Sequence, residues 1–330
     1  MSEKKFIFDD RWIGEHGIGR FAKEVRKCDL DFESISLTGN PAGKFDVLKL
    51  TLFLFLKSNK YYFSPGYNAP YFFINRSIIT VHDLNHVDIN SNSSFLKRVY
   101  YKYVLKRACK RALVIFTVSS FSKQRIVEWS GADDRKIIVV GNGVSEEFNE
   151  DVTAYQNEAP YLFIVGNRKE HKNEESALLA FLNAKIPHNF QLIMTGDASP
   201  TLTDILVKNN AAYRVKFLGK VTNKELASLY KGATCLLFPS LYEGFGLPVI
   251  ESMACGTPVI TSNTTSLPEV SQGAALLVDP KSLSDITAAI ETIVNNEDIC
   301  ICMIEKGYKQ AAKFRWEKTR EIIENTIKLL

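Results

Sequence analysis

Short apolar runs that alternate with helical stretches constrain the fold of this chain most. In the first half of the sequence they fall at 5–9, 61–64, 77–82, 113–118 and 136–140. Each run ends in polar or glycine residues, and a helix fits between successive runs. This alternation predicts a parallel sheet with helices on both of its faces.

A polar stretch at 146–160 interrupts this pattern, which then begins again. After it we expect strands at 161–165, 191–195, 215–218, 235–238 and 258–261, and helices at 174–184, 223–231, 249–254, 282–295 and 299–330. A chain of 330 residues favours two domains. We therefore predict α/β domains at 1–155 and 156–310, with 311–330 as a C-terminal helix that packs back on the first domain.

Composition and charge limit the class of protein. Hydrophobic residues make up 45% and charged residues 24%, as in a globular chain. The N-terminus lacks the apolar core of a signal peptide, and the longest apolar run, 50–56, is far shorter than the ~20 residues that span a bilayer. The six cysteines show no metal-site spacing. We expect a cytoplasmic protein with reduced thiols.

Two carboxylates in the stretch 240–270 suggest a ligand. Glu243 and Glu251 lie eight positions apart, and Gly244 and Gly246 come between them in a loop that leads into a helix. Such a loop brings bare backbone N–H groups and a helix N-terminus to a negative ligand. The carboxylates can accept hydrogen bonds from hydroxyls. Phosphates and hydroxyls occur together in a nucleotide-sugar.

Three further segments carry candidate residues. Arg168 and Lys172 are four positions apart where a helix opens, so they can converge on one anion, as a leaving diphosphate requires. His82 ends an expected strand and is either structural or a ligand contact. The glycine turn 17–20 follows the first strand; it either joins strand to helix or lets a ligand approach the backbone.

Together these motifs resemble the retaining glycosyltransferases of family 4. That family has the GT-B fold, an α/β architecture of two Rossmann-like doubly wound domains that face each other across a cleft. The resemblance covers nearly the whole chain and is strongest over 161–279. It implies transfer of a hexose from a nucleoside-diphosphate sugar by front-face substitution, which needs no protein nucleophile.

The resemblance also implies roles for individual residues. Glu243 contacts the donor sugar, Glu251 binds the ribose hydroxyls, and Arg168 with Lys172 neutralises the diphosphate. His82 reaches the donor sugar from the N-terminal domain. Positions where the backbone approaches the donor are Gly17, Gly19, Gly166, Gly219, Gly244, Phe245, Gly246 and Leu247. Many members place arginine directly after the glycine, where this chain has Asn167, so Lys169 and His171 compete with Arg168 for the arginine role.

Within the family the chain looks most like mannosyltransferases of bacterial surface polysaccharide synthesis, such as O-antigen or capsule. GDP-mannose is the leading donor, ahead of dTDP-rhamnose and UDP-sugars, and the expected acceptor is a glycan on a lipid diphosphate. No metal cofactor is expected, because Arg168 and Lys172 would neutralise the leaving diphosphate and no DxD motif follows a strand. The alternatives are a nucleotide-sugar epimerase or a phosphorylase on the same fold, and a non-catalytic sugar-nucleotide binding module.

The stretch 95–111 is the most basic part of the chain. No acid occurs between Asp88 and Glu128, and Tyr100, Tyr101 and Tyr103 lie among the cations. An amphipathic helix of this kind suits an anionic membrane surface, here the inner face of the plasma membrane. The alternative is a solvated helix that covers the sheet. Nucleic acid is not expected, since no recognition module accompanies the charge.

Overall fold

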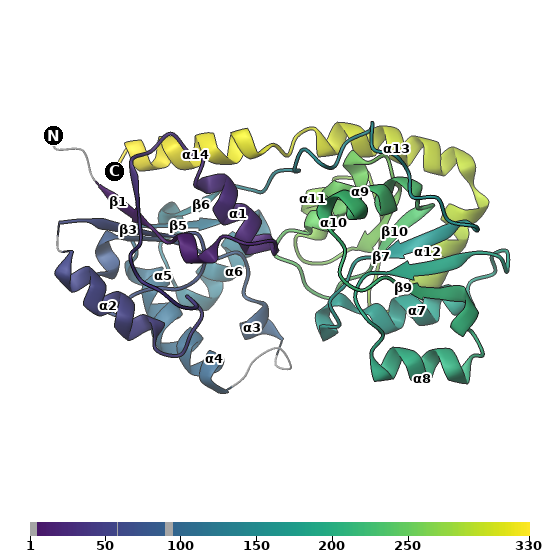
Figure 1. Cartoon of the computed structure of the whole chain (residues 1–330), viewed down its shortest axis with the longest axis horizontal. Helices are drawn as coiled ribbons and strands as arrows, with labels where there is room; N and C mark the ends of the chain where they lie inside the picture. The colour runs from purple at the N-terminus through teal and green to yellow at the C-terminus, as the bar shows by residue number, and fades with distance from the viewer. Residues whose placement is uncertain (1–4, 58, 90–94) are drawn as a thin grey trace. The chain divides into compact units, whose positions relative to one another are not determined.

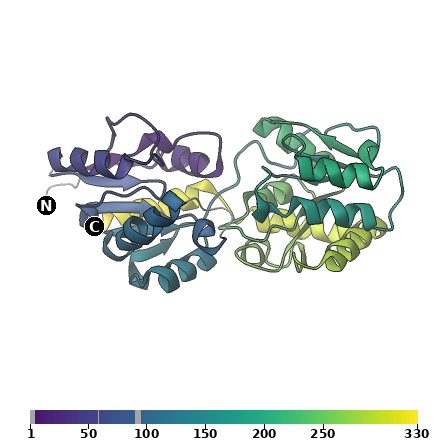
Figure 2. The same cartoon turned by 90° about the horizontal axis from the view of Figure 1, so that it is seen from below.

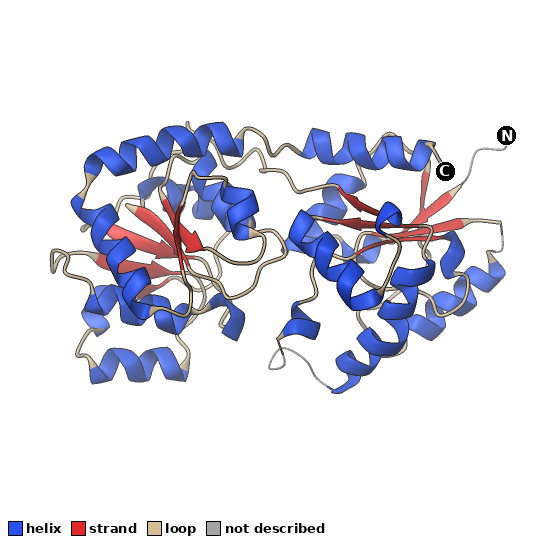
Figure 3. Cartoon of the chain, turned by 180° about the vertical axis from the view of Figure 1, so that it is seen from behind, coloured by secondary structure: helices blue, strands red, loops and turns tan. Residues whose placement is uncertain are grey.

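The computed structural model describes residues 5–57, 59–89 and 95–330. The chain forms two compact units, one of Met1–Gly143 with Trp316–Leu330 and one of Val144–Arg315 (Figure 1). Each unit contains a six-stranded parallel sheet with helices on both faces (Figure 2 and Figure 3). The predicted α/β class is confirmed.

The first unit has the strand order β2-β1-β3-β4-β5-β6. Its strands are β1 (Phe6–Phe8), β2 (Phe32–Ser34), β3 (Tyr61–Ser64), β4 (Ser77–Thr80), β5 (Val114–Thr117) and β6 (Ile137–Val139). Its helices are α1 (Gly17–Val25), α2 (Asp46–Leu56), α3 (Asn85–Asp88), α4 (Phe95–Tyr100), α5 (Lys106–Arg111), α6 (Ser120–Ser130) and α14 (Trp316–Lys328). Every residue of β4 and β5 is buried, as expected for a parallel sheet covered on both faces.

The second unit has the strand order β12-β11-β10-β7-β8-β9. Its strands are β7 (Tyr161–Ile164), β8 (Gln191–Met194), β9 (Val215–Phe217), β10 (Cys235–Phe238), β11 (Val259–Ser262) and β12 (Leu276–Val278). Its helices are α7 (Glu174–Asn183), α8 (Pro200–Lys208), α9 (Asn223–Gly232), α10 (Leu247–Ala254), α11 (Leu267–Ser271), α12 (Leu283–Asn295) and α13 (Glu297–Ala311). This is the Rossmann order. The strands β7 and β10 are parallel, but successive strands are added toward opposite edges of the sheet on either side of this pair. Ligands of such sheets bind beyond the carboxyl ends of the strands at this pair.

The predicted glycine turn at 17–20 is wrong as a turn, because these residues form the first turn of α1. His16 caps the helix, and its Nδ1 accepts a hydrogen bond from the Gly19 amide at 3.0 Å. A Cβ on Gly19 would lie 2.4 Å from the carbonyl oxygen of Gly14. The glycine therefore permits close packing of the preceding loop on the helix.

The basic stretch 95–111 is a helix, but two of its three tyrosines make contacts inside the first unit. A π-helical turn at Tyr101–Leu105 joins α4 to α5 and buries Tyr101. The Tyr100 hydroxyl donates to the Tyr67 carbonyl at 2.8 Å and accepts from the Ala69 amide. Of these tyrosines only Tyr103, 58% exposed, presents its ring to solvent.

The chain passes from one unit to the other twice, after Gly143 and after Arg315, whereas the sequence analysis predicts one boundary at 155. The stretch 146–160 packs on the second unit, where the Tyr155 amide donates to the Ser228 carbonyl at 2.9 Å. Helix α14 packs on the first unit and contributes Trp316, Ile323 and Ile327 to the cluster that contains Phe21.

Candidate active site

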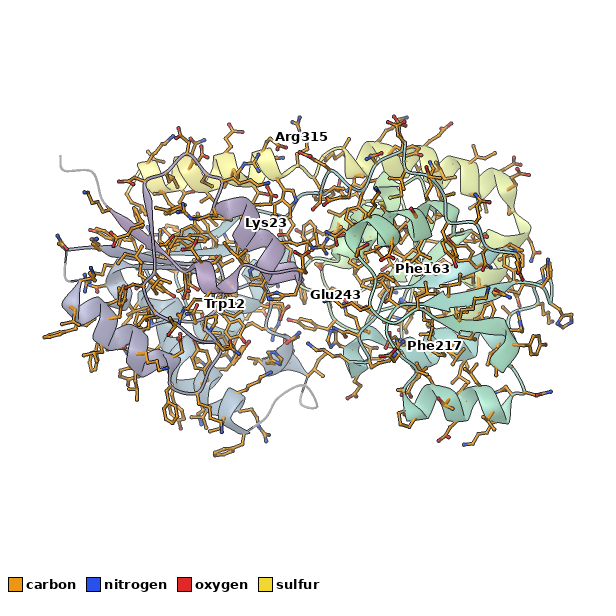
Figure 4. The ribbon with its side chains drawn as sticks, in the orientation of Figure 1. Trp12, Lys23, Phe163, Phe217, Glu243 and Arg315 are labelled. Atoms are coloured by element: carbon orange, nitrogen blue, oxygen red, sulfur yellow. The ribbon has the colours of Figure 1, made fainter. Side chains whose placement is uncertain are left out.

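Most predicted donor residues of the second unit lie in the segments after β7 and β10, the two strands between which the strand order reverses; Gly219 follows β9. The loop 165–173 leaves β7, and the loop 239–246 leaves β10 and ends at α10. In Figure 4, Phe163 of β7, Phe217 of β9 and Glu243 of the second loop mark this edge of the sheet. The topology thus gathers segments that are about 70 residues apart in the chain.

Lys172 and Glu243 form an ion pair across the two loops. The Lys172 Nζ donates to Glu243 Oε1 at 2.7 Å, and the two side chains are 16% and 12% exposed. The ammonium also lies 5.0 Å from the centroid of the Phe238 ring. The structure therefore joins two of the predicted catalytic residues directly and holds a cation at the rim of the sheet.

Arg168 is anchored differently from Lys172. Its backbone is left-handed, with φ of 61°, which is uncommon for a residue with a side chain. Its Nε donates to the Asp197 carbonyl at 2.6 Å and its Nη2 to the Thr195 carbonyl at 2.7 Å. The guanidinium lies over the Phe217 ring. Arg168 thus ties together the segments that leave β7 and β8, and its partners differ from that of Lys172.

Glu174 is a site residue that the sequence did not reveal. Its buried carboxylate accepts the Arg168 amide at 3.0 Å and forms an ion pair with the guanidinium. A Cβ on Gly166 would lie 1.5 Å from Glu174 Oε1, so this carboxylate occupies the space that the glycine leaves. Burial raises the pKa of Glu174, while Arg168 opposes that shift. An acid in the first turn of a helix is so common that it gave no signal.

The loop from Glu243 to Gly246 is held by a buried serine that the sequence also did not reveal. Ser266 Oγ lies 2.9 Å from the Glu243 carbonyl and 3.0 Å from the Phe245 carbonyl. The Phe245 ring packs edge-on against Phe314 at 5.5 Å between centroids. Its side chain therefore faces the interior, and a ligand of this segment would meet backbone, including Gly244.

Glycines at two turns of this edge have left-handed backbones. Gly246 has φ of 100° and precedes Leu247, the first residue of α10; a Cβ on it would lie 2.6 Å from Leu267 Cδ2. Gly219 has φ of 64°, and its carbonyl accepts the Gly196 amide at 2.7 Å. Both conformations favour glycine over any side chain. The N-terminus of α10 thereby starts directly at the loop, with its positive end at the edge of the sheet.

Glu251 lies one turn into α10 and is 1% exposed. Its Oε2 accepts a hydrogen bond from the buried Tyr230 hydroxyl at 3.2 Å. A pocket of about 570 Å³ lies next to the loop after β7; its lining includes Arg168, Glu174 and Ser199 but not Lys172, Glu243 or Glu251. Arg168 and Lys172, the two predicted cations for the diphosphate, therefore do not line this pocket together.

In the first unit, His82 follows β4 and is held by its own surroundings. Its Nε2 lies 2.9 Å from the Pro65 carbonyl, and its ring packs edge-on to Phe21. Ser122 Oγ donates to the His82 carbonyl at 3.0 Å from the start of α6, whose N-cap is Ser119. Burial lowers the pKa of His82 to about 4, so the imidazole is neutral at neutral pH.

This pKa predicts that the first unit loses stability in mild acid. Between pH 6.5 and about 4 the unfolded chain binds a proton at His82 that the folded chain does not. The free energy of unfolding therefore falls as the pH falls through this range, by about 3 kcal/mol over the whole range. Denaturant unfolding followed by tryptophan fluorescence measures it, because all three tryptophans belong to this unit.

The control for this experiment is His82→Gln. Other titrating groups are common to both proteins, so the difference between their pH profiles isolates the imidazole. The substitution should flatten the profile between pH 6.5 and about 4. Equal slopes in the two proteins would contradict the assignment.

Comparisons with known proteins agree on the kind of protein. Residues 145–310 match the family described as Glycosyl transferases group 1, and residues 59–148 match Glycosyltransferase Family 4. O-antigen chain mannosyltransferase B of Escherichia coli is 28% identical over 82% of this chain and 74% of its own length. O-antigen chain mannosyltransferase RfbU of Salmonella typhimurium is 31% identical over 75% of this chain and 68% of its own length.

A solved structure shows the same fold. The crystal structure of Anabaena Alr3699/HepE in complex with UDP-glucose superposes with a TM-score of 0.77 at 16% identity, over 99% of this chain and 100% of that one. Two doubly wound α/β units, each with a six-stranded parallel sheet, define the GT-B fold. The chain belongs to the group 1 glycosyl transferases, with a family 4 N-terminal part, so the predicted family and enzyme class are confirmed.

The described part of the chain has neither a cluster of metal ligands nor a helix suited to span a membrane. Among residues 5–57, 59–89 and 95–330, no group of three or more His, Cys, Asp or Glu side chains is placed to hold a metal ion. Within the same residues, no helix has the length and apolar character needed to cross a membrane.

Proposed function

We propose that this glycosyltransferase moves mannose, with retention of configuration, from GDP-mannose to a hydroxyl of a lipid-linked glycan in O-antigen or capsule synthesis. The ion pair between Lys172 and Glu243 is the observation on which the proposal rests most. Its two side chains, bonded at 2.7 Å, are the cation that we assign to the phosphate and the carboxylate that we assign to the sugar hydroxyls. The two relatives named as O-antigen mannosyltransferases support the choice of sugar and pathway.

In the proposed reaction the bond between the sugar C1 and the diphosphate oxygen breaks, and a bond from C1 to the acceptor oxygen forms on the same face. The acceptor proton passes to the leaving phosphate, so no protein nucleophile takes part. Lys172 and the N-terminus of α10 stabilise the charge that develops on the diphosphate. Glu243 orients the sugar hydroxyls, and Glu251 binds the ribose.

Arg168 and the glycines have supporting roles in the proposal. Arg168 holds the loop after β7 by its bonds to Glu174 and to two carbonyls, and its remaining N–H groups are available to phosphate. Gly219 and Gly244 let the backbone approach the donor, whereas Gly166 makes room for the Glu174 carboxylate that holds the loop. For the first unit we propose that His82 and the segment from Gly17 to Gly19 contribute to substrate binding. We place the enzyme at the cytoplasmic face of the plasma membrane.

A panel of nucleotide-sugars, read by nucleotide release, tests the proposal. We expect the fastest turnover with GDP-mannose and a lipid-linked glycan, and no loss of rate when EDTA is added, because protein cations neutralise the leaving group. Faster turnover with dTDP-rhamnose or a UDP-sugar would overturn the donor. Donor hydrolysis that needs no acceptor would indicate an epimerase. Binding without turnover would indicate a non-catalytic module.

A further inference from the structure

Helix α2 has two apolar faces, and only one of them is packed. Leu50 and Leu54 are fully buried in the first unit. Leu48, Leu52 and Phe55, at spacings of four and three residues on the other side, are 67%, 63% and 65% exposed. Soluble helices normally carry polar residues on the face away from the core. This open stripe therefore requires an explanation.

The helix is firmly anchored, so the stripe is a stable feature of the surface. Asp46, at its first residue, is buried and accepts from Arg11 Nη1 at 2.6 Å and from Asn68 Nδ2 at 3.1 Å. Arg11 also pairs with the buried Asp9 directly after β1. A helix held by a buried ion network and two core leucines presents its outer side in one orientation.

Neighbouring segments extend the stripe into a larger surface. The Tyr71 amide donates to Thr51 Oγ1 of α2 at 2.9 Å, and Phe72 beside it is 58% exposed. The Arg107 guanidinium lies 4.6 Å from the centroid of the Tyr71 ring, which connects α5 to this loop. A pocket of about 410 Å³ is lined jointly by the start of α2 and by α4.

We call this surface the α2–α4 face, and Figure 1 shows α2, α4 and α5 on one side of the first sheet. Its exposed large apolar residues are Phe45, Leu48, Leu52, Phe55, Leu56, Tyr71, Phe72, Phe95, Leu96, Val99 and Tyr103. These are 11 of the 19 such residues among the described part of the chain, so the apolar surface is concentrated here. Patches of this kind mark interaction sites.

The charge of the face is positive and almost without acids. Its exposed cations are Lys44, Lys49, Lys97, Arg98, Lys102, Lys110 and Arg111. Asp46 is the one acid between residues 35 and 60, and it is buried against Arg11. Exposed apolar side chains framed by cations match the two layers of an anionic bilayer, acyl chains and charged headgroups.

We propose that the α2–α4 face seats this enzyme on an anionic lipid bilayer, with the open stripe of α2 inserted among the acyl chains. Helix α2 has 11 residues, about 16 Å, so it lies in the interface and does not span the bilayer. The stretch 95–111 then supplies most of the charge and α2 the deepest apolar contact. The proposal rests on the proposed function, because a lipid-linked acceptor is the reason for this enzyme to bind a membrane.

Sedimentation of the full chain with lipid vesicles tests this proposal without donor or acceptor. We expect binding to vesicles of phosphatidylcholine with phosphatidylglycerol, and binding at least about tenfold weaker to phosphatidylcholine alone or in high salt. The double substitution Leu52→Gln with Phe55→Gln should weaken binding to the anionic vesicles by about tenfold or more. Unchanged binding of this variant would overturn the proposal.

The matched control is Val207→Gln with Tyr213→Gln in the second unit, where both side chains are more than 70% exposed. It should bind vesicles like the parent chain. Tryptophan fluorescence shows whether the α2 variant is folded. If light scattering finds a dimer that the α2 variant dissociates, and no vesicle binding occurs, the face joins two copies and the proposal fails. Donor turnover on a soluble acceptor is measured separately, so a wrong donor and a wrong surface give different results.

Discussion

Replacing Lys172 with alanine is expected to lower the rate of sugar transfer by about 10²–10³-fold, the usual cost of losing one group that stabilises charge in a transition state. Lys172 is the cation that pairs with Glu243, at 2.7 Å, and its ammonium is largely withdrawn from solvent. A charge in such a place is screened less than one in water. Steady-state kinetics with the preferred donor measure the effect.

The control for Lys172→Ala is Lys169→Ala in the same loop. Lys169 is exposed and three residues earlier, so the net charge of the loop changes equally in both variants. We expect Lys169→Ala to keep the rate within about threefold, as for surface charges. If both variants lose the same activity, the general charge of the loop matters and the specific role of Lys172 is wrong. A change in KM alone would assign Lys172 to donor binding.

Replacing Glu251 with alanine is expected to weaken nucleotide binding by about 10- to 100-fold, the cost of losing hydrogen bonds to a charged group. The Tyr230 hydroxyl donates to this carboxylate at 3.2 Å, and a carboxylate can accept more than one hydrogen bond. In the proposed role, ribose hydroxyls donate to the same group. Calorimetric titration with the free nucleoside diphosphate measures the affinity.

Tyr230→Phe separates the ligand role of Glu251 from its structural role. It removes the internal hydrogen bond of 3.2 Å and leaves the carboxylate in place. We expect its affinity for nucleotide to stay within about threefold of the parent, at the cost of about 1 kcal/mol of stability. Unchanged affinity in Glu251→Ala would refute the ribose assignment.

Most strands could be predicted because buried parallel strands appear as continuous apolar runs. The expected 61–64 and 235–238 coincide with β3 and β10, and other predicted strands differ by one or two residues at their ends. Strands β2 and β12 were missed; each lies at the edge of its sheet and has one buried residue of three, so the pattern of a fully buried strand is incomplete. Helix α2 was missed because apolar residues on both faces erase the helical period.

At the candidate site the sequence indicated which loops matter, while their internal contacts depend on the fold. Ser266 bonds to the carbonyls of Glu243 and Phe245 across 23 and 21 residues of chain. Glu174 directly follows its loop, but its bond to the Arg168 amide requires the left-handed backbone at Arg168, which no motif reveals. The anchoring of Arg168 to the carbonyls of Thr195 and Asp197 is equally non-local. A motif shows that a residue type recurs at a position; it does not show which partner the side chain has.

The return of the C-terminus to the first unit sets the order in which the protein can be completed during synthesis. Helix α14 supplies Trp316, Ile323 and Ile327 to a core whose other members lie before residue 144. The second unit is one continuous stretch of chain, so all of it leaves the ribosome while the first unit still lacks a helix. The core of the first unit therefore stays partly uncovered until residues 316–328 have been synthesised.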